Sequence, residues 1–396
     1  MGEADYIVKG FRASAVAAGI KKDKGLDLAL ILSDNSATVA GAFTTNTVKA
    51  APVLLSSERV TKGRARAILC NSGNANACTG ERGIRDARST GNFVADQVGI
   101  ASEEVLLAST GVIGQPLDTG IIKTAVPGLV QGLSPEGIPL AARAIMTTDS
   151  FPKISVFEGS AGDKPYRILG IAKGAGMIMP NMATMLAFIL SDIKIEAGFL
   201  QQALLSSIET SFNRISVDGD MSTNDTVLVM ANGQAGNMSI SDFEHAEFEK
   251  GLHSVMDELA RMIVRDGEGA TKVVDIVVRG AATPGDALRA ARIVANSSLV
   301  KTAFYGCDPN WGRIMAALGR AGIGMKEELV DILVDDVLIV ERGLGKGVEA
   351  EKKAASRMKQ DKFTVTIELG QGGFKERITT CDLTHDYITI NADYRS

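Results

Sequence analysis

The sequence predicts an α+β protein with a layered sandwich architecture. Strand-like and helix-like segments are interleaved along the 396 residues without the regular β-α-β period of a doubly wound sheet. No internal repeat or low-complexity tract is present. The chain is long enough for roughly two to three domains, although no linker rich in Pro, Gly or Ser marks a boundary.

Short apolar runs and two segments with helical spacing make up the first half of the chain. We expect strands at residues 28–32, 37–43, 67–70 and 166–172, and a further strand that comes after Thr184 and reaches residue 190. We expect helices at residues 85–98 and 138–146, and a polar turn at residues 71–76. These elements follow one another irregularly, which favours mixed rather than purely parallel sheets.

The second half of the chain continues the mixed pattern. Its longest amphipathic segment, residues 242–265, is expected to be a helix that ends at Asp266 and Gly267. Further helices are expected at residues 199–212 and 285–296. Further strands are expected at residues 226–230, 273–278, 329–340, 363–369 and 387–390. We interpret the charged segment 349–362 as a solvated surface segment.

Composition and charge argue against several classes of protein. Hydrophobic residues make up 45% of the chain and charged residues 22%, as in ordinary globular proteins. The formal net charge of -5 argues against a nucleic-acid partner, which requires a basic excess. No apolar run reaches the length of about 18 residues that a membrane span needs, and the N-terminus is acidic where a signal peptide is basic. We therefore expect a cytoplasmic protein.

The cysteines and acidic loops do not predict a metal site. Cys70 and Cys78 have no histidine nearby, and four cysteines are too few for a disulfide framework in this chain. The loop that begins at Asp218 lacks the glutamate that an EF-hand calcium loop requires. We expect reduced structural thiols, no metal and no cofactor.

Residues 173–188 carry most of the chemical information. A Gly-rich turn and a Pro-Asn turn lead to Thr184, which starts an apolar run and follows the small Ala183. A threonine at such a bend can attack the carbonyl before it and cleave the chain, which releases its own amino group as a base for its hydroxyl. The pKa of an α-amino group, about 7.7–8.0, suits this task. The alternative is an ordinary strand threonine.

Self-cleavage between Ala183 and Thr184 would divide the chain into two fragments, residues 1–183 and residues 184–396. The three histidines are far from any Gly-rich elbow, so a Ser-His-Asp triad has little support. The amine released at Thr184 supplies a base without a histidine.

The tract and six further segments resemble the glutamate N-acetyltransferase/ornithine acetyltransferase family of arginine biosynthesis. The six segments are residues 109–114 (STGVIG), 147–149 (TTD), 216–225 (SVDGDMSTND), 267–272 (GEGATK), 308–313 (DPNWGR) and 391–396 (NADYRS). They follow the family's order, so the resemblance extends over essentially the whole chain. It implies two packed sheets flanked by helices, an N-terminal-nucleophile-like fold with a smaller C-terminal α/β part.

The resemblance also implies roles for residues around the nucleophile. Thr110 and Gly111 match the positions that form the family's oxyanion hole, and a hydroxyl beside an open backbone N–H suits that task. The alternative for this pair is a plain turn at the end of a strand. Lys173 and Thr147 match substrate-binding positions, and a lysine could pair with a substrate carboxylate. The alternative for Lys173 is a surface lysine at a turn.

Three further residues match the family's substrate-binding positions, Glu268, Asn391 and Ser396. An ornithine-like substrate carries an ammonium group, which requires acceptors such as a carboxylate. Considered without the resemblance, Glu268 would be a charge at the end of a helix.

The implied activity is a ping-pong transfer of acetyl from N2-acetylornithine to glutamate through an acetylated Thr184. Some relatives also acetylate glutamate from acetyl-CoA, a co-substrate that no residue here requires or excludes. The implied assembly is an α2β2 heterotetramer of the two fragments. Two alternatives remain open: a self-cleaving amidohydrolase or aminopeptidase with water as the acceptor, and a non-catalytic small-molecule-binding protein that stays uncut.

Overall fold

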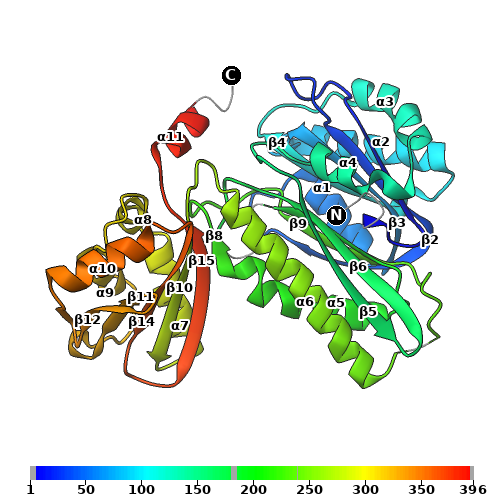
Figure 1. The fold of residues 1–396 in the computed structure, drawn as a ribbon. Coiled ribbons are helices and arrows are strands. Elements are labelled where there is room, and N and C mark those ends of the chain that lie inside the picture. The colour runs from blue at the N-terminus through cyan, green and yellow to red at the C-terminus, as the bar shows by residue number, and fades with distance from the viewer. Residues whose placement is uncertain (1–5, 180–184, 239, 393–396) are drawn as a thin grey trace. The chain divides into compact units, whose positions relative to one another are not determined.

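The structure, a computed structural model, describes residues 6–179, 185–238 and 240–392. The chain divides into two compact units (Figure 1). The first unit contains Met1–Asn213 and Asp220–Ile263, and the second contains Arg214–Gly219 and Val264–Ser396. Within the described residues, no helix is long and apolar enough to cross a lipid bilayer.

An eight-stranded mixed sheet forms the centre of the first unit, with strand order β4-β3-β2-β9-β7-β6-β5 and β1 paired to β2. The strands are β1 (Phe11–Val16), β2 (Leu28–Phe43), β3 (Arg64–Asn74), β4 (Val105–Val112), β5 (Lys153–Ala161), β6 (Lys164–Lys173), β7 (Leu186–Ser191) and β9 (Thr226–Ala231). The β3–β4 and β7–β9 pairs are parallel, and the other neighbours are antiparallel.

Two strands from further along the sequence, β7 and β9, lie in the middle of this sheet. β7 pairs with β6 on one side and with β9 on the other, and β9 pairs with β2. In register, Lys173 of β6 is opposite Leu186 of β7, and Leu186 is opposite Thr226 of β9. The predicted cleavage point therefore lies in the connection between two hydrogen-bonded neighbours.

Helices bury both faces of the first sheet. They are α1 (Ala51–Val60), α2 (Gly80–Val98), α3 (Thr119–Gln131), α4 (Ile138–Ala144), α5 (Ala197–Thr210) and α6 (Asp242–Arg265). Along β2, Leu28 and Leu30 pack with α1, α2 and α3, whereas Ala29 and Ile31 pack on the opposite face with α4. Burial of both faces explains why the central strands are continuously apolar rather than alternating.

The second unit has its own seven-stranded mixed sheet, ordered β13-β12-β11-β14-β10-β15-β8. Its strands are β8 (Ile215–Ser216), β10 (Val273–Ala281), β11 (Asp331–Val334), β12 (Val337–Glu341), β13 (Leu344–Gly345), β14 (Lys362–Glu368) and β15 (Phe374–Cys381). Its helices are α7 (Pro284–Ala295), α8 (Ser298–Tyr305), α9 (Trp311–Gly319), α10 (Val348–Met358) and α11 (His385–Ala392). Small residues of α7, among them Ala287 and Ala291, allow close packing on Ile276 of β10.

The predicted α+β class is confirmed, because two mixed sheets are each flanked by helices. The prediction of a strand at residues 387–390 was wrong: these β-branched and aromatic residues lie in α11, where no residue is buried and no strand pairs with them. The expected strand 329–340 is two strands, β11 and β12, because the chain turns at Asp335, which has φ 49°.

The charged segment 349–362 is mostly helix α10, which is solvated on one side and buries Ala354 and Met358 on the other. The expected division at residues 183 and 184 is chemical, and it stays a prediction. The two compact units follow a different boundary, because each fragment contributes strands to the first sheet.

Helix α6 packs closely on β5, and this contact predicts a stability effect. A Cβ atom added to Gly251 would lie 2.4 Å from the Phe157 ring, whereas one added to the helical Gly128 of α3 would meet nothing within 4 Å. We expect Gly251→Ala to lower the free energy of unfolding by about 1–3 kcal/mol through overpacking. Gly128→Ala, the control, should leave it unchanged or raise it by about 0.5–1 kcal/mol. Urea denaturation measures both, and equal stability of the two variants would contradict this packing.

Candidate active site

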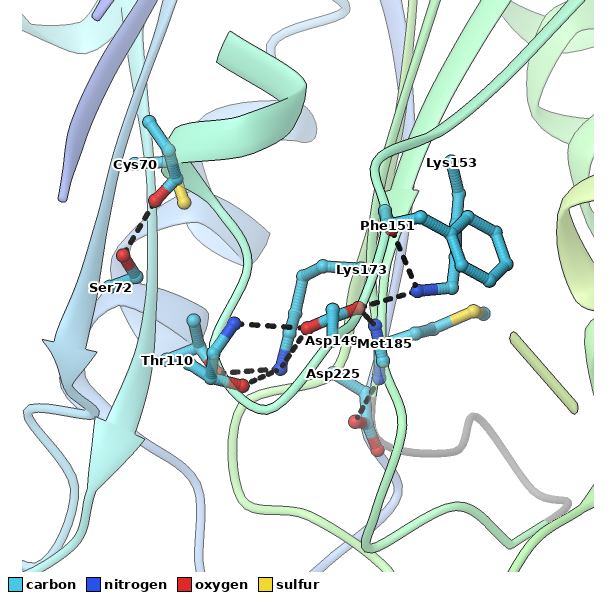
Figure 2. A network of polar contacts seen from close by, with 12 residues as sticks. Cys70, Ser72, Thr110, Asp149, Phe151, Lys153, Lys173, Met185 and Asp225 are labelled. Atoms are coloured by element: carbon cyan, nitrogen blue, oxygen red, sulfur yellow. Dashed lines mark hydrogen bonds and ion pairs between the residues drawn. The ribbon is translucent and has the colours of Figure 1, made fainter. Parts of the chain in front are cut away.

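A cluster of polar side chains surrounds Lys173 at the end of β6 (Figure 2). The Lys173 Nζ atom donates to the Thr147 hydroxyl at 2.7 Å and lies 3.4 Å from the Thr110 hydroxyl. Its side chain is only 5% exposed. Lys173 is thus buried within this polar cluster, and the alternative of a surface lysine is wrong.

Asp149 holds this cluster together (Figure 2). Its Oδ1 atom accepts hydrogen bonds from the Lys153 ammonium at 2.7 Å and from the Gly174 amide at 2.6 Å. Its Oδ2 atom accepts from the Thr147 amide at 2.9 Å and lies 3.9 Å from the Lys173 Nζ atom. One carboxylate therefore connects Lys153, Lys173 and the Gly174 backbone with the segment that carries Thr147.

The buried lysines control the charge of Asp149. Burial alone would raise the pKa of this carboxyl, but the charges of Lys173 and Lys153 and the hydrogen bonds from Lys153 and Gly174 lower it to about 2. The Lys153 side chain is fully buried, as is that of Asp149. Asp149 and Lys153 form a neutral pair, so Lys173 adds one positive charge to the cluster.

Thr110 and Gly111 lie at the end of β4, beside the end of β3. Gly111 has φ 132°, and a Cβ atom there would lie 2.3 Å from the Gly73 carbonyl carbon, so a side chain cannot be accommodated. The ladder is irregular at this point, because Asn74 pairs with both Thr110 and Val112. A bulge of this kind is a common way of directing backbone groups toward a site.

The entry to β7 is fixed by two hydrogen bonds. The Met185 amide donates to the Asp225 Oδ1 atom at 3.0 Å, and the Thr226 amide donates to the Met185 carbonyl at 3.1 Å. Ala183 and Thr184 lie outside the described residues. The structure therefore describes the residue that follows the predicted nucleophile, together with the strands on both sides of it.

Cys70, the thiol labelled in Figure 2, is not a competing nucleophile. It is 1% exposed in β3. Burial raises the pKa of its thiol to about 12, although the charges of Lys173 and Lys21 act in the opposite direction. Because the thiolate is the reactive form, Cys70 is an inert thiol at neutral pH.

Two of the predicted substrate-binding residues meet in the second unit. The Asn391 Nδ2 atom of α11 donates to the Glu268 Oε2 atom at 2.7 Å. Glu268 is 8% exposed in the loop after α6, although Asn391 is exposed. Ser396 lies outside the described residues. Glu268 is therefore a paired, buried carboxylate rather than a solvated charge at a helix end.

The structure thus brings Thr110, Gly111, Thr147 and Lys173 together in the first unit, and Glu268 with Asn391 in the second. Asp149, Lys153 and Asp225 were not predicted from the sequence as site residues. Asp149 and Asp225 both stood in recognised segments, TTD and SVDGDMSTND, which was the available signal. Lys153 lies outside the recognised segments, so no sequence motif indicated it. Among the described residues, no cluster of three or more His, Cys, Asp or Glu side chains could hold a metal ion.

Known proteins are similar in sequence to this chain over nearly its whole length. The ArgJ family model matches residues 12–396. The arginine biosynthesis bifunctional protein ArgJ of Geobacter sulfurreducens is 53% identical over 391 residues, which cover 98% of this chain and 100% of that protein. The glutamate N-acetyltransferase of Methanocaldococcus jannaschii is 46% identical over 400 residues, which cover 98% of this chain and 97% of that protein.

A solved structure extends this similarity to three dimensions. The crystal structure of the arginine biosynthesis bifunctional protein ArgJ from Bacillus halodurans has 40% sequence identity and a TM-score of 0.50. The match covers 52% of this chain but 97% of the solved chain. The solved chain is therefore about half as long as this one.

The Asp149 network predicts a specific sensitivity to acid. Because the folded-state pKa is about 2 and the unfolded value is about 3.9, the carboxylate stabilises the fold above pH 4 and this contribution is lost as the pH falls toward 2. It amounts to about 2 kcal/mol. Urea midpoints at pH 7 and pH 3 should differ less in Asp149→Asn than in the unchanged protein. Asp34→Asn, which alters a carboxylate that is 42% exposed, is the control and should keep the original difference.

Proposed function

The chain belongs to the ArgJ family, and from this premise we propose that it moves the acetyl group of N2-acetylornithine to glutamate through an acetylated Thr184. It is an acyltransferase of arginine biosynthesis, since its relatives over nearly the whole chain are arginine biosynthesis bifunctional proteins and a glutamate N-acetyltransferase. The observation that best supports the route through Thr184 is the buried cluster of Lys173, Thr147 and Thr110 beside the strand that follows Thr184.

Activation is a self-cleavage between Ala183 and Thr184. The Thr184 hydroxyl oxygen attacks the Ala183 carbonyl carbon, a C–O bond forms, the C–N bond breaks, and the hydroxyl proton passes to the Thr184 nitrogen. Water then hydrolyses the ester, which leaves a carboxylate on Ala183 and a hydroxyl group beside a new amino group on Thr184. The half-length solved chain of the Bacillus halodurans relative supports this division.

Acetyl transfer then takes two steps. The Thr184 oxygen attacks the acetyl carbonyl of N2-acetylornithine while the amine takes its proton, and the proton leaves with the ornithine amine as the acetyl C–N bond breaks. The glutamate amine attacks the acetyl ester, loses its proton to the same base, and departs as N-acetylglutamate while Thr184 regains its hydroxyl group. Thr110 and Gly111 stabilise the oxyanion in both steps.

Charge in the cluster supports recognition of an amino acid. The cluster contains one buried carboxylate, Asp149, and two buried lysines, Lys153 and Lys173, and this excess of positive charge favours an α-carboxylate, which both substrates carry. The Thr147 hydroxyl adds a hydrogen bond. We assign Glu268, Asn391 and Ser396 to the side-chain ammonium of ornithine, a role supported by the paired, buried carboxylate of Glu268.

We further propose that no resident cofactor is required and that acetyl-CoA serves as a second acetyl donor, which would account for the word bifunctional in the names of the relatives.

A cytoplasmic location fits the four unpaired cysteines. We propose that the two fragments stay paired and assemble as an α2β2 heterotetramer. The interleaving of β7 and β9 between strands of the first fragment supports the pairing.

Intact mass spectrometry tests the nucleophile. The purified protein should appear as fragments of residues 1–183 and 184–396, whereas Thr184→Ala should remain whole and inactive. Thr184→Ser should keep part of the self-cleavage and part of the transferase activity, because serine retains the hydroxyl group. Whole-length protein that still transfers acetyl groups would contradict the proposal. Acetylornithine consumption with and without glutamate separates a transferase from a hydrolase, which releases acetate in the absence of an acceptor.

Two lysines at opposite ends of β6 test substrate recognition. We expect Lys173→Met to raise KM about 10- to 100-fold for both acetylornithine and glutamate, because a charged hydrogen bond to a carboxylate is worth about 1.5–3 kcal/mol. Lys164→Met alters an exposed lysine paired with Asp163 and should leave both KM values unchanged. Steady-state kinetics of the cleaved proteins measures both variants. An unchanged KM in Lys173→Met would contradict the assigned role.

A further inference from the structure

Asn224 is a buried amide that bridges the two strand ends beside Thr110 and Gly111. It lies two residues before the start of β9 and is 5% exposed. Its Nδ2 atom donates to the Ser109 carbonyl of β4 at 2.8 Å and to the Ala75 carbonyl, directly after β3, at 2.7 Å. Both hydrogens of the amide are therefore bonded, one to each of two neighbouring segments of the sheet.

The bridge is placed where the ladder between β3 and β4 is irregular. Asn74 pairs with both Thr110 and Val112. A Cβ atom added to Gly111 would lie 2.3 Å from the Gly73 carbonyl carbon and 2.5 Å from the Asn74 nitrogen, so the two backbones are in close contact. A bulge interrupts regular ladder bonding, and a side-chain amide can hold the strands together at such a point.

The Asn224 side chain is itself held in one orientation. Its Oδ1 atom accepts from the Thr223 hydroxyl at 2.6 Å, its backbone N–H donates to the Ser222 hydroxyl at 3.0 Å, and its carbonyl accepts from the Thr226 hydroxyl at 2.9 Å. Only the Nδ2 atom of an asparagine can donate to two carbonyls, so the amide cannot be reversed. A fully bonded side chain of this kind can fix the position of its partners.

Ser109 transmits this constraint to Thr110. The Ser109 carbonyl and the Thr110 N–H belong to the same planar peptide group, so a bond to the carbonyl also orients that N–H. The Ser109 hydroxyl donates to the Asn71 Oδ1 atom at 2.5 Å, and both residues are 5% exposed. Ser109 is thus held through its backbone by Asn224 and through its side chain by Asn71.

The next residue, Asp225, connects the same segment to the start of β7. Its Oδ1 atom accepts from the Met185 amide at 3.0 Å (Figure 2). Two consecutive residues therefore bond to Ser109, which precedes Thr110, and to Met185, which precedes β7. The spacing between these two segments depends on a single dipeptide.

We propose that Asn224 is a positioning residue for the oxyanion hole assigned to Thr110 and Gly111. The inference rests on the proposed function, because negative charge develops beside these groups only during acyl transfer. By holding the Ser109 and Ala75 carbonyls, Asn224 keeps the peptide before Thr110 and the backbone around Gly111 in place. Donors stabilise a developing charge only when they are aimed at it in advance, so their displacement lowers kcat more than substrate binding.

The experiment compares two buried asparagines in the full chain. Asn232→Ala is the matched control for Asn224→Ala, because Asn232 follows the other end of β9, is 7% exposed, and donates to the Lys9 carbonyl at 3.0 Å. In the cleaved protein we expect kcat of Asn224→Ala to be about 10- to 100-fold below that of the control. The KM values for acetylornithine and glutamate should differ by less than about twofold between the two variants.

Two further measurements separate positioning from general support of the fold. Ornithine has no acetyl carbonyl, so its affinity, measured by calorimetry, should be the same in Asn224→Ala and Asn232→Ala. Thr223→Val removes the hydroxyl group that bonds to the Asn224 Oδ1 atom and leaves both Nδ2 donors present. We expect this milder variant to lower kcat about three- to tenfold, with KM unchanged.

Each outcome decides the inference. A kcat of Asn224→Ala within about twofold of the control would overturn it, and so would a selective loss of ornithine affinity, since Asn224 would then support the whole site. Where Asn224→Ala gives no folded or no cleaved protein, lowered kcat in Thr223→Val supports the inference and unchanged kcat overturns it. Failure of the proposed function is distinct, because the unchanged protein would then transfer no acetyl group to glutamate, or Thr184→Ala would still transfer it.

Discussion

The Asp149 carboxylate, held by two buried ammonium groups, is the interaction on which the geometry of the first unit's site depends. It joins Lys153 of β5, Lys173 of β6 and the segment that carries Thr147. Burial of charges is costly, so a fully bonded network of this kind tolerates few alternative arrangements. The network therefore gives Lys173 a defined position at the end of β6.

Two buried carboxyl groups of the same unit have opposite protonation tendencies for identifiable reasons. Asp149 has two lysines near it, and its pKa is lowered. Asp225 is dominated by desolvation, and its pKa is raised. Separation of pKa values between neighbouring groups is a common basis for dividing acid, base and binding roles. Here it separates a carboxylate that binds lysines from a carboxyl group beside the Met185 backbone whose pKa is raised by burial.

Strong periodicity made much of the fold predictable from sequence. The helix at residues 242–265 has the predicted bounds, and the apolar runs that became β2, β7 and β9 were recognisable. Residues 387–390 were not predictable, because strand-forming side chains there have no strand to pair with. The motif positions Thr110, Thr147 and Lys173 were found by resemblance. Lys153 and the Met185–Asp225 bond arise from tertiary contacts, which local sequence does not encode.

The central place of β7 and β9 in the first sheet has a consequence for the order of events during maturation. While the chain is whole, the sheet assembles within one molecule. Under the proposed cleavage at Thr184, the same sheet would join two polypeptides, and its recovery after complete denaturation would become a bimolecular reaction whose yield depends on concentration. Correct folding would then have to precede the proposed scission.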